Sequence, residues 1–439
     1  MAGPPSGASA APPSIVILLA DDLSYGDIGV HGTADAPTPL IDKLAAQGVR
    51  FTDAYATSPV CGPSRAGLIS GRYPSRIGVS RNKDVLPAAV KTIGEVFQSA
   101  GYRTALFGKW HLGEGPLNAN RRGFEEFDGF HYRAEKYEDK VGEFLPHFFT
   151  RKSLDFIRQE DARPFLIIVS FSDPDTPIRP PAKYLERIEH ALSPLRRGYL
   201  GLVMALDEAV GTIMSGLEEA GLEEETLVVF ANDNGGPGVS DRCAAKNTSS
   251  NTPLRGFKQE LYEGGIRVPL IMRWTDTLPV RVTFEEPVTL MDLLPTAASP
   301  AQVEVRTPLD GVDLLPHLLE TPAEPAHPQL FWTHHGDLAI REGPWKLLLV
   351  QDSAPQLFNL ARDQSETTNL AAAEPARARS NATCSRGLIA RSSTPNGPAR
   401  GVSRHHPPER SSAVTVPRRS GSMSPARAGR TPSCSTTEI

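Results

Sequence analysis

Cysteine is scarce in this chain, which has only Cys61, Cys243, Cys384 and Cys434 among its 439 residues. These cysteines form no C-x-x-C pair, and they are too sparse for a disulfide framework. Long apolar runs are also lacking, because none reaches the ~20 residues of a transmembrane helix. The run Ile15–Ala20 is too short for the core of a signal peptide. The sequence therefore argues against a disulfide scaffold and predicts no membrane span.

A strong excess of one charge is lacking as well. The net charge is -5 at pH 7, so nothing points to nucleic acid or an anionic membrane as a partner. Without a visible export signal, the sequence as written predicts a cytoplasmic protein. A mis-assigned start codon would instead hide the signal of a periplasmic or secreted protein. The oligomeric state is left open by the composition.

Four apolar runs end in polar clusters: SIVILLADD, RTALFGKWHLG, RPFLIIVSFSDPDTP and ETLVVFANDNGG. Continuous apolar runs of this length predict strands that are buried on both faces. Helix-like segments lie between them, the longest being LGLVMALDEAVGTIMSGLEEAG. This alternation predicts an α/β fold, a large, mainly parallel mixed sheet flanked by helices. Ligands of such sheets bind beyond the carboxyl ends of the strands, where all four clusters lie.

The end regions have a different composition. Residues 310–370 contain short strand-like runs and turns, and they predict a small C-terminal antiparallel sheet after a main domain of residues 14–309. Residues 1–13 and 371–439 are predicted to be disordered. The segment 371–439 holds eleven Arg, three Glu, no Lys and no Asp, a net charge of +8 that leaves -13 for residues 1–370. This abrupt change favours a frameshift in a GC-rich gene over a functional basic arm.

The strand-end residues Asp21, Asp22, Asp233 and Asn234 offer only oxygen ligands. Such a set suits a hard cation, calcium or magnesium, rather than zinc. Either pair alone would be read as a strand-ending turn or a helix cap. Two pairs at matching strand ends favour a metal site, with a further oxygen ligand from a nucleophile or a substrate.

Lys109 and His111 lie two residues apart, so on an extended segment their side chains would point the same way. A lysine and a histidine that face a metal make a site for a doubly charged anion, a phosphate or sulfate ester. The alternative is an exposed lysine and a capping histidine. Lys258, taken alone among glycines and polar residues, would be read as a surface lysine.

Cys61 stands in the segment CGPSR. A buried structural thiol is the commonest role of a free cysteine. Arg65 nearby could instead lower the pKa of Cys61 and produce a thiolate nucleophile. A thiolate has no evident role beside a hard cation, which prefers oxygen. This mismatch suggests that the residue is converted to an oxygen species before it acts.

These residues resemble the sulfatase family of the alkaline-phosphatase superfamily. The family signature is Cys-x-Pro-Ser-Arg, two residues, two apolar residues and Thr-Gly-Arg, and this chain reads CGPSRAGLISGR, with Ser70 in place of Thr. Similar segments are ADDLSYGDIGVHG, GYRTALFGKWHLG, FANDNGG and LYEGGIRVPLIMRW. The resemblance spans about Ile15–Leu370. It implies an alkaline-phosphatase-like fold with residues 14–309 as the catalytic domain.

The resemblance also implies a mechanism. A formylglycine-generating enzyme would oxidise Cys61 to Cα-formylglycine, whose aldehyde hydrates to a diol. One hydroxyl attacks sulfur, and the other later expels sulfate. One calcium ion would be held by Asp21, Asp22, Asp233, Asn234 and the modified Cys61. Arg65 would hold the diol, His111 would take the proton that releases sulfate, and Lys109 and Lys258 would bind sulfate oxygens.

One residue departs from the family pattern. Family members usually read Ala-Pro-His-Thr-Pro after the third strand, whereas this chain reads DPDTP, with Asp175 in place of the histidine. An ionised aspartate only accepts hydrogen bonds and would repel sulfate, at a cost of roughly 4 kcal/mol for close like charges. Asp175 would then be protonated, turned elsewhere, or the cause of a slow enzyme.

The leading hypothesis is a calcium-dependent sulfuric ester hydrolase acting on an aryl or carbohydrate sulfate, either a small molecule or a glycan. One alternative is a phosphonate or phosphodiester hydrolase of the same superfamily, whose substrate Asp175 would tune. The other is a catalytically impaired homologue, suggested by Asp175 and by the unusual tail.

Overall fold

The computed structural model describes residues 11–32, 35–188, 192–238, 249–320 and 324–392. Its largest element is an eight-stranded sheet with the strand order β5-β4-β6-β1-β7-β8-β2-β9. In that order the strands are Glu126–Phe130, Arg103–Lys109, Phe165–Pro174, Ser14–Asp21, Thr226–Asn232, Leu270–Arg273, Val49–Phe51 and Val282–Phe284. Neighbouring strands from β5 to β7 are parallel, and β8 is antiparallel to both β7 and β2. The predicted mainly parallel mixed sheet is confirmed.

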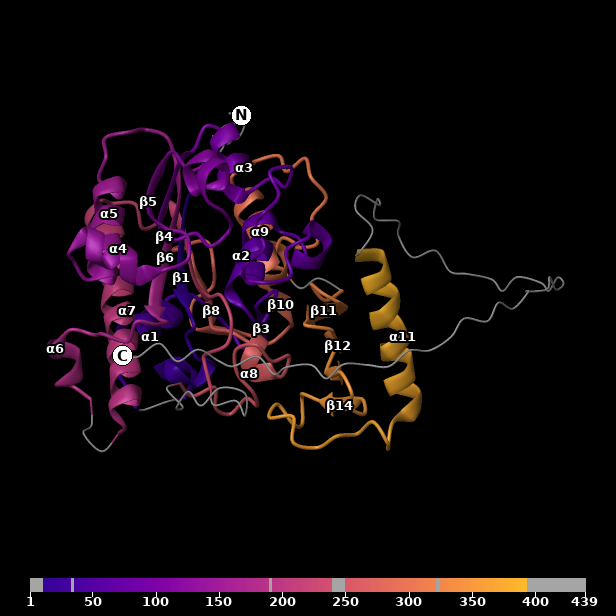
Figure 1. Cartoon of the computed structure of the whole chain (residues 1–439). Helices are drawn as coiled ribbons and strands as arrows, with labels where there is room; N and C mark the ends of the chain where they lie inside the picture. The colour runs from indigo at the N-terminus through magenta and orange to yellow at the C-terminus, as the bar shows by residue number, and fades with distance from the viewer. Residues whose placement is uncertain (1–10, 33–34, 189–191, 239–248, 321–323, 393–439) are drawn as a thin grey trace, which may run out of the picture. The chain divides into compact units, whose positions relative to one another are not determined.

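Both faces of this sheet are covered by helices. Alternate residues of β1 enter two separate hydrophobic cores, with Ile15, Ile17 and Leu19 in one and Val16, Leu18 and Ala20 in the other. The first core includes side chains from α2 (Cys61–Ser70), α3 (Ile93–Ser99) and α9 (Leu293–Ala298). The second includes side chains from α1 (Pro39–Ala46), α5 (Leu145–Ile157) and α7 (Pro194–Glu219). Figure 1 shows β1, β4 and β6 between these two sets of helices.

The apolar runs therefore form strands because both of their faces are buried. β1, β4, β6 and β7 are the four runs that the sequence predicted, and β1 lies between β6 and β7. Because these four strands are parallel, their carboxyl ends lie at one edge of the sheet. The described part of this region also contains four short helices: α4 (Ala134–Val141), α6 (Ala182–Leu185), α8 (Glu263–Ile266) and α10 (Leu315–Leu319). It also contains one small strand pair, β3 (Ala54–Tyr55) with β10 (Val288–Thr289).

The helix α7 bears on the predicted lack of a membrane span. By length and composition alone, this described helix could cross a membrane. Most of its apolar part is buried inside the protein, however, and it packs as a core helix against α1, α5 and β6.

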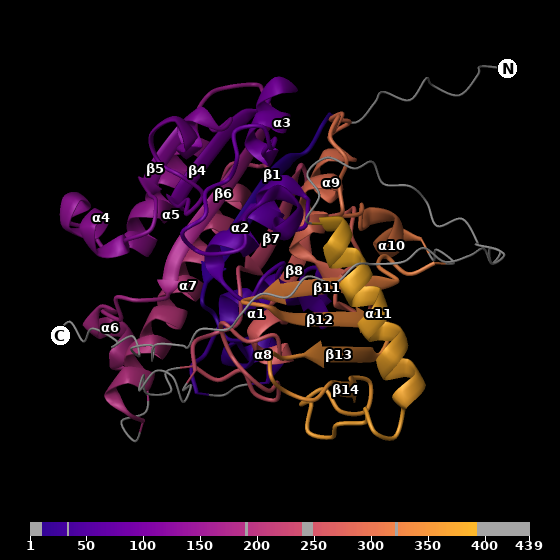
Figure 2. The ribbon, with the colours of Figure 1, turned by 45° about the vertical axis from the view of Figure 1, so that its right-hand side comes forward.

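The small antiparallel sheet is also present, in the order β11-β12-β13-β14 (Figure 2). Its strands are Gln329–His334, Asp337–Glu342, Trp345–Leu349 and Gln356–Asn359. One face packs on Tyr55, Leu261 and Ile266, which lie outside it. The division of the chain at residue 309 stays a prediction.

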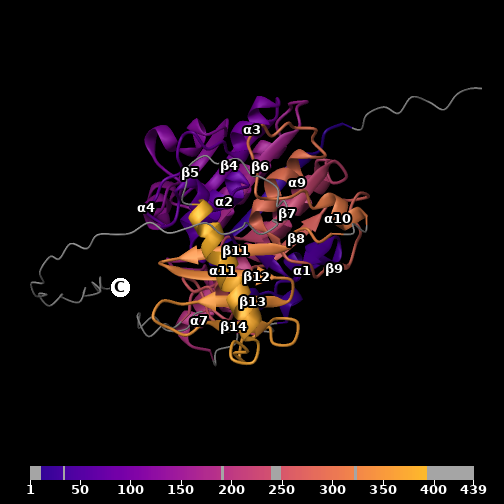
Figure 3. The ribbon, with the colours of Figure 1, turned by 90° about the vertical axis from the view of Figure 1, so that its right-hand side faces the viewer.

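The other face of the small sheet carries a helix that the sequence analysis missed. Residues 375–392 form α11 (Pro375–Ser392), which lies across the sheet in Figure 3. Ala378 and Ala382, one helical turn apart, pack against a cluster that includes Ile340 and Leu347. The prediction of disorder from residue 371 is therefore wrong for this helix, because the apolar outer face of the sheet supplies the packing that the helix lacks by itself. Residues 1–10 and 393–439 of the predicted disordered segments lie outside the described residues.

Candidate active site

Two carboxylates at the end of β1 meet two polar residues that follow β7. Asp21 ends β1, and Asp22 follows it with a left-handed φ of 63°. The Asp22 amide donates a hydrogen bond to Asp233 Oδ1 at 3.3 Å, and Asn234 Nδ2 donates one to Asp22 Oδ1 at 2.7 Å. A positive φ is uncommon for a residue with a Cβ, and it persists where surrounding contacts hold it. The two strand ends thus form one buried cluster.

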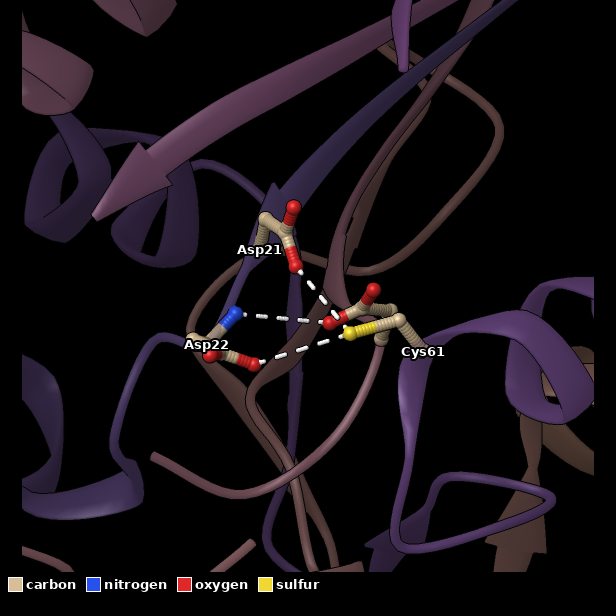
Figure 4. A group of neighbouring side chains, drawn as sticks. Asp21, Asp22 and Cys61 are labelled. Atoms are coloured by element: carbon tan, nitrogen blue, oxygen red, sulfur yellow. Dashed lines mark hydrogen bonds between the residues drawn. The ribbon is translucent and has the colours of Figure 1, made fainter. Parts of the chain in front are cut away.

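Cys61 faces this cluster from the first turn of α2. Its side chain is buried, and its Sγ lies 3.6 Å from Asp21 Oδ1 and 3.9 Å from Asp22 Oδ1 (Figure 4). Burial raises the pKa of the Cys61 thiol well above its usual value, against the opposing effect of two lysines. This shift favours a neutral thiol over the alternative of a thiolate produced by Arg65.

Arg65 lies one helical turn after Cys61 and is buried with it. Its Nε donates to Asp233 Oδ2 at 2.8 Å, and its Nη2 lies 3.6 Å from Asp21 Oδ2. Its Nη1 donates to the Lys109 carbonyl at 3.0 Å and to Ser170 Oγ at 2.6 Å. Arg65 therefore ties the ends of β1, β4, β6 and β7 together. Its Nη2 makes no hydrogen bond to any residue that the structure describes, so one edge of the guanidinium has donor capacity left.

Two lysines contact the carboxylates. Lys109, the last residue of β4, donates to Asp21 Oδ2, and Lys258 Nζ lies 2.5 Å from Asp22 Oδ2 and 3.2 Å from Cys61 Sγ. Burial opposes the charge of both ammonium groups, but Asp21 and Asp22 outweigh it and raise the pKa of Lys109 and Lys258. Lys258, which the sequence alone would assign to the surface, is thus a charged group beside the thiol.

His111 lies two residues after the end of β4, where the backbone no longer continues the strand. It has a left-handed φ of 58°, so Lys109 and His111 do not share one extended segment and the reasoning from alternation is wrong there. His111 Nε2 lies 3.1 Å from the Asn82 carbonyl. A carbonyl only accepts, so Nε2 carries the proton and Nδ1 holds the lone pair. Burial, with the charges of Lys109 and Arg65, lowers the pKa of His111 to about 2.

Asp175 faces the site from the segment that follows β6. Its Oδ2 lies 3.6 Å from Lys109 Nζ, and its side chain is 25% exposed. The amide of Thr176 donates to Asp175 Oδ1 at 2.7 Å and fixes the carboxylate. The alternative that Asp175 points away from the site is wrong. Lys109 lies between two carboxylates, those of Asp21 and Asp175.

Three residues of the site were missed by the sequence analysis. Asn82 accepts from the Gly62 amide at 3.0 Å and so joins the start of α2 to His111. Ser170 donates to the Lys109 carbonyl at 2.7 Å, and Asn232 pairs with both backbone groups of Leu23. Ser170 stands inside the apolar strand β6, and Asn232 is the last residue of the apolar strand β7. A buried polar residue in such a strand needs a hydrogen-bond partner, so this signal was available in the sequence. Asn82 stands in a polar loop and carries no such signal.

The arrangement fits a hard cation. Ligand atoms of Asp21, Asp22, Cys61 and Asp233 lie within 4.8 Å of one another, and all four residues are buried. The Asn234 Oδ1 atom is buried and has no hydrogen-bond partner in the described part of the chain, so a further oxygen is available to an ion. Burial raises the pKa of Asp22 well above its usual range and that of Asp233 to about 6, and neighbouring carboxylates add to both shifts. A divalent cation would offset the repulsion among these groups.

Comparison with known proteins gives consistent results. A family model described as Sulfatase matches residues 13–303. The chain is 32% identical to arylsulfatase A of Homo sapiens, over 83% of the chain and 84% of that protein. It is 32% identical to N-acetylgalactosamine-6-sulfatase of Rattus norvegicus, over 70% of the chain and 66% of that protein.

Two solved structures extend the comparison. The crystal structure of Ps i-CgsB in complex with k-i-k-neocarrahexaose matches with a TM-score of 0.79 and 30% identity, over 87% of this chain and 93% of the other. The phosphonate monoester hydrolase of Agrobacterium radiobacter matches with a TM-score of 0.71 at 20% identity, over 87% of this chain and 96% of the other. The second match shows a shared fold alone.

Proposed function

The chain belongs to the sulfatase family, and we propose that it hydrolyses a sulfate ester at the site around Cys61. The observation that carries this proposal is the convergence of three carboxylates and Lys258 on one buried thiol. A hard cation held by carboxylate oxygens prefers a further oxygen ligand, and the sulfur of Cys61 does not suit it unless an oxygen replaces that sulfur. We therefore infer that Cys61 is the precursor of Cα-formylglycine, made by a formylglycine-generating enzyme.

Asp21, Asp22, Asp233 and Asn234 would hold one calcium ion. Bound there, calcium would supply Lewis-acid stabilisation of negative charge, and a hydrated formylglycine would supply the attacking oxygen. The chain's own residues supply the remaining functions. Lys258 and Lys109 present positive charge around position 61 and would bind the sulfate oxygens.

His111 supplies a proton acceptor. The Asn82 carbonyl fixes its Nε2–H tautomer, so Nδ1 can accept a proton. The low pKa of His111 keeps the ring neutral before the reaction. A bound sulfate beside the ring would favour the protonated form and raise the pKa toward the range useful for catalysis. Arg65 fixes the ends of four strands, and its Nη2 could donate to an oxygen on position 61.

Asp175 would act here as the second partner of Lys109 rather than as a proton donor. Its carboxylate forms an ion pair with the same ammonium group as Asp21. The same negative charge would weaken sulfate binding, so we expect an active enzyme with reduced affinity for sulfate. An alternative phosphonate or phosphodiester hydrolase is not favoured, because the two relatives named above, each 32% identical, are sulfatases.

The proposed substrate is an aryl or carbohydrate sulfate. Two printed names support a carbohydrate: the N-acetylgalactosamine in the name of one relative and the k-i-k-neocarrahexaose bound in one solved structure. Protein matured by a formylglycine-generating enzyme is expected to hydrolyse an aryl sulfate and to lose this activity in a chelator. No turnover above the Cys61→Ala variant, with aryl sulfates and a panel of sulfated sugars, would overturn the proposal.

A further inference from the structure

A cavity of about 780 Å³ lies beside His111 at the carboxyl edge of the large sheet. We call it the basic cavity, and its wall includes Asn82, Lys83, His111, Tyr132, Arg133 and Lys136. Its elements are the ends of β4 and β5, the loop before α3 and the first turn of α4, which lies beside β5 in Figure 2. A space of this size accommodates one or two sugar rings, since small-molecule sites are commonly about 300–1,000 Å³.

The basic cavity adjoins the reacting residue. Asn82 accepts a hydrogen bond from the Gly62 amide, directly after Cys61, and its carbonyl holds His111. A Cβ built on Gly62 would lie 3.2 Å from the Asn82 Cα. The same side chains therefore border both the reaction centre and the cavity. A substrate whose sulfate lies at Cys61 has this cavity as adjacent space for the rest of the molecule.

The charge of the cavity wall differs from that of the protein. Lys83, Arg133 and Lys136 bring three positive charges, whereas Glu114 is the one acid among the described residues of the wall. Residues 1–370 carry a net charge of -13, so this positive wall stands out against an acidic chain. Among the described residues, none of these three cations takes part in an ion pair. They are exposed and available to a ligand.

An aromatic ring accompanies these cations. Tyr132 is 53% exposed, and its ring centroid lies 4.6 Å from that of His111 at an interplanar angle of 44°. A tyrosine ring offers an apolar face and a polar tip, which suits the mixed surface of a sugar. A ring packed on the proton acceptor can thus hold the sugar whose sulfate is cleaved. Together the wall offers one apolar surface and three cations.

We propose that the basic cavity binds a second anionic group, a carboxylate or a further sulfate, on the carbohydrate whose sulfate ester is cleaved. This inference rests on the proposed sulfatase activity. The preferred substrates are then acidic oligosaccharides with at least two negative charges. Lys83, Arg133 and Lys136 are specificity-determining residues for them. A neutral sugar that bears a single sulfate lacks the group these cations recognise.

The test measures binding separately from turnover. The Cys61→Ala protein is titrated calorimetrically at low ionic strength with three disaccharides: one with a single sulfate, one with a second sulfate, and one with a uronate carboxylate. The second anion is expected to tighten binding about tenfold, or ~1.4 kcal/mol. In an Arg133→Ala/Lys136→Ala background the gain should fall to about twofold or less. Lys140→Ala is the matched control, because Lys140 lies on α4 one turn beyond Lys136 and over the Tyr137 ring, outside the wall.

Each outcome decides the inference. A gain from the second sulfate, the uronate or both supports it and identifies the anion. Equal affinity for all three sugars overturns the inference. It is also overturned if the gain in affinity from the second anion survives in the double variant, or if Lys140→Ala loses that gain to the same extent. Turnover of an aryl sulfate by the mature enzyme tests the proposed function on its own, so the two failures are distinct.

Discussion

The reaction centre and the basic cavity adjoin each other, but they hold their charges in opposite ways. At the centre, Asp21, Asp233 and Arg65 are almost completely buried and every charge has a partner. In the cavity, Lys83, Arg133 and Lys136 are exposed. Buried paired charges keep a fixed geometry, because removing one partner leaves the other without compensation. Exposed charges remain available to a ligand, so the first region suits chemistry and the second suits selectivity.

The largest expected difference between the two regions comes from a substitution at position 61 in the reaction centre. Cys61→Ala should lower kcat on an aryl sulfate by at least about a thousandfold, since the nucleophile is removed. Its melting temperature should stay close to that of the wild type, because only one small buried group is lost. The matched control is Ser70→Ala at the far end of α2, where the hydroxyl donates to the Ala66 carbonyl of the same helix. A Cys61→Ala enzyme with more than a tenth of wild-type turnover would contradict the assignment.

Arg65 tests whether the buried pairs also stabilise the fold. Arg65→Met, with a chelator present, should lower the free energy of unfolding by about 3–5 kcal/mol, because Asp233 and Asp21 lose their partner. Arg81→Met breaks an exposed pair with Asp84 and should cost about 1 kcal/mol or less. Denaturant titrations of both variants measure the difference. Equal losses would show that burial does not distinguish the two pairs.

Calcium should stabilise the reaction centre alone. At about 100 times its Kd, calcium should raise the free energy of unfolding by about 2.7 kcal/mol, because it binds only the folded state. Asp233→Asn should remove most of this gain, whereas Asp161→Asn, at an exposed ion pair with Arg163, should retain it. Thermal melts with and without calcium measure both. A gain that is the same in both variants would place the ion elsewhere.

Asp175 shares features of both regions, since it is partly exposed like the cavity cations and paired, with Lys109, like the buried charges of the reaction centre. Asp175→Asn should raise kcat/KM for an aryl sulfate about tenfold at low ionic strength, because one negative charge near the bound sulfate is removed. The gain should shrink as salt is added. Asp155→Asn, on the exposed side of α5, is the matched control. A fall in kcat/KM would show that Asp175 is needed to position Lys109.

Much of this site could be predicted from the sequence because it depends on strand ends. Apolar runs mark β1, β4, β6 and β7, and parallel pairing brings their polar ends to one edge. The CGPSR segment is specific to a family, so its chemistry could be inferred before its position on α2 was known. The left-handed φ at Asp22 and His111 could not be predicted from the sequence, because it is imposed by long-range contacts rather than by local preference.

Other features depend on tertiary partners. The helix α11 has little apolar periodicity of its own, and the outer face of the small sheet supplies its packing. Asn82 became part of the site only because its Oδ1 accepts a hydrogen bond from the Gly62 amide and its carbonyl accepts one from the His111 ring. Asp175 was identified as a departure from a pattern, but its pairing with Lys109 needed coordinates. In each case, a residue's role is set by a neighbour that is distant in the sequence.

Mass spectrometry of the tryptic peptide 51–65, which contains Cys61, tests most directly whether position 61 is an oxygen nucleophile. Protein co-expressed with a formylglycine-generating enzyme should carry an aldehyde there in place of the thiol. Turnover of an aryl sulfate should rise in proportion to the aldehyde fraction across preparations. Full turnover by protein whose peptide carries only the thiol would contradict this assignment.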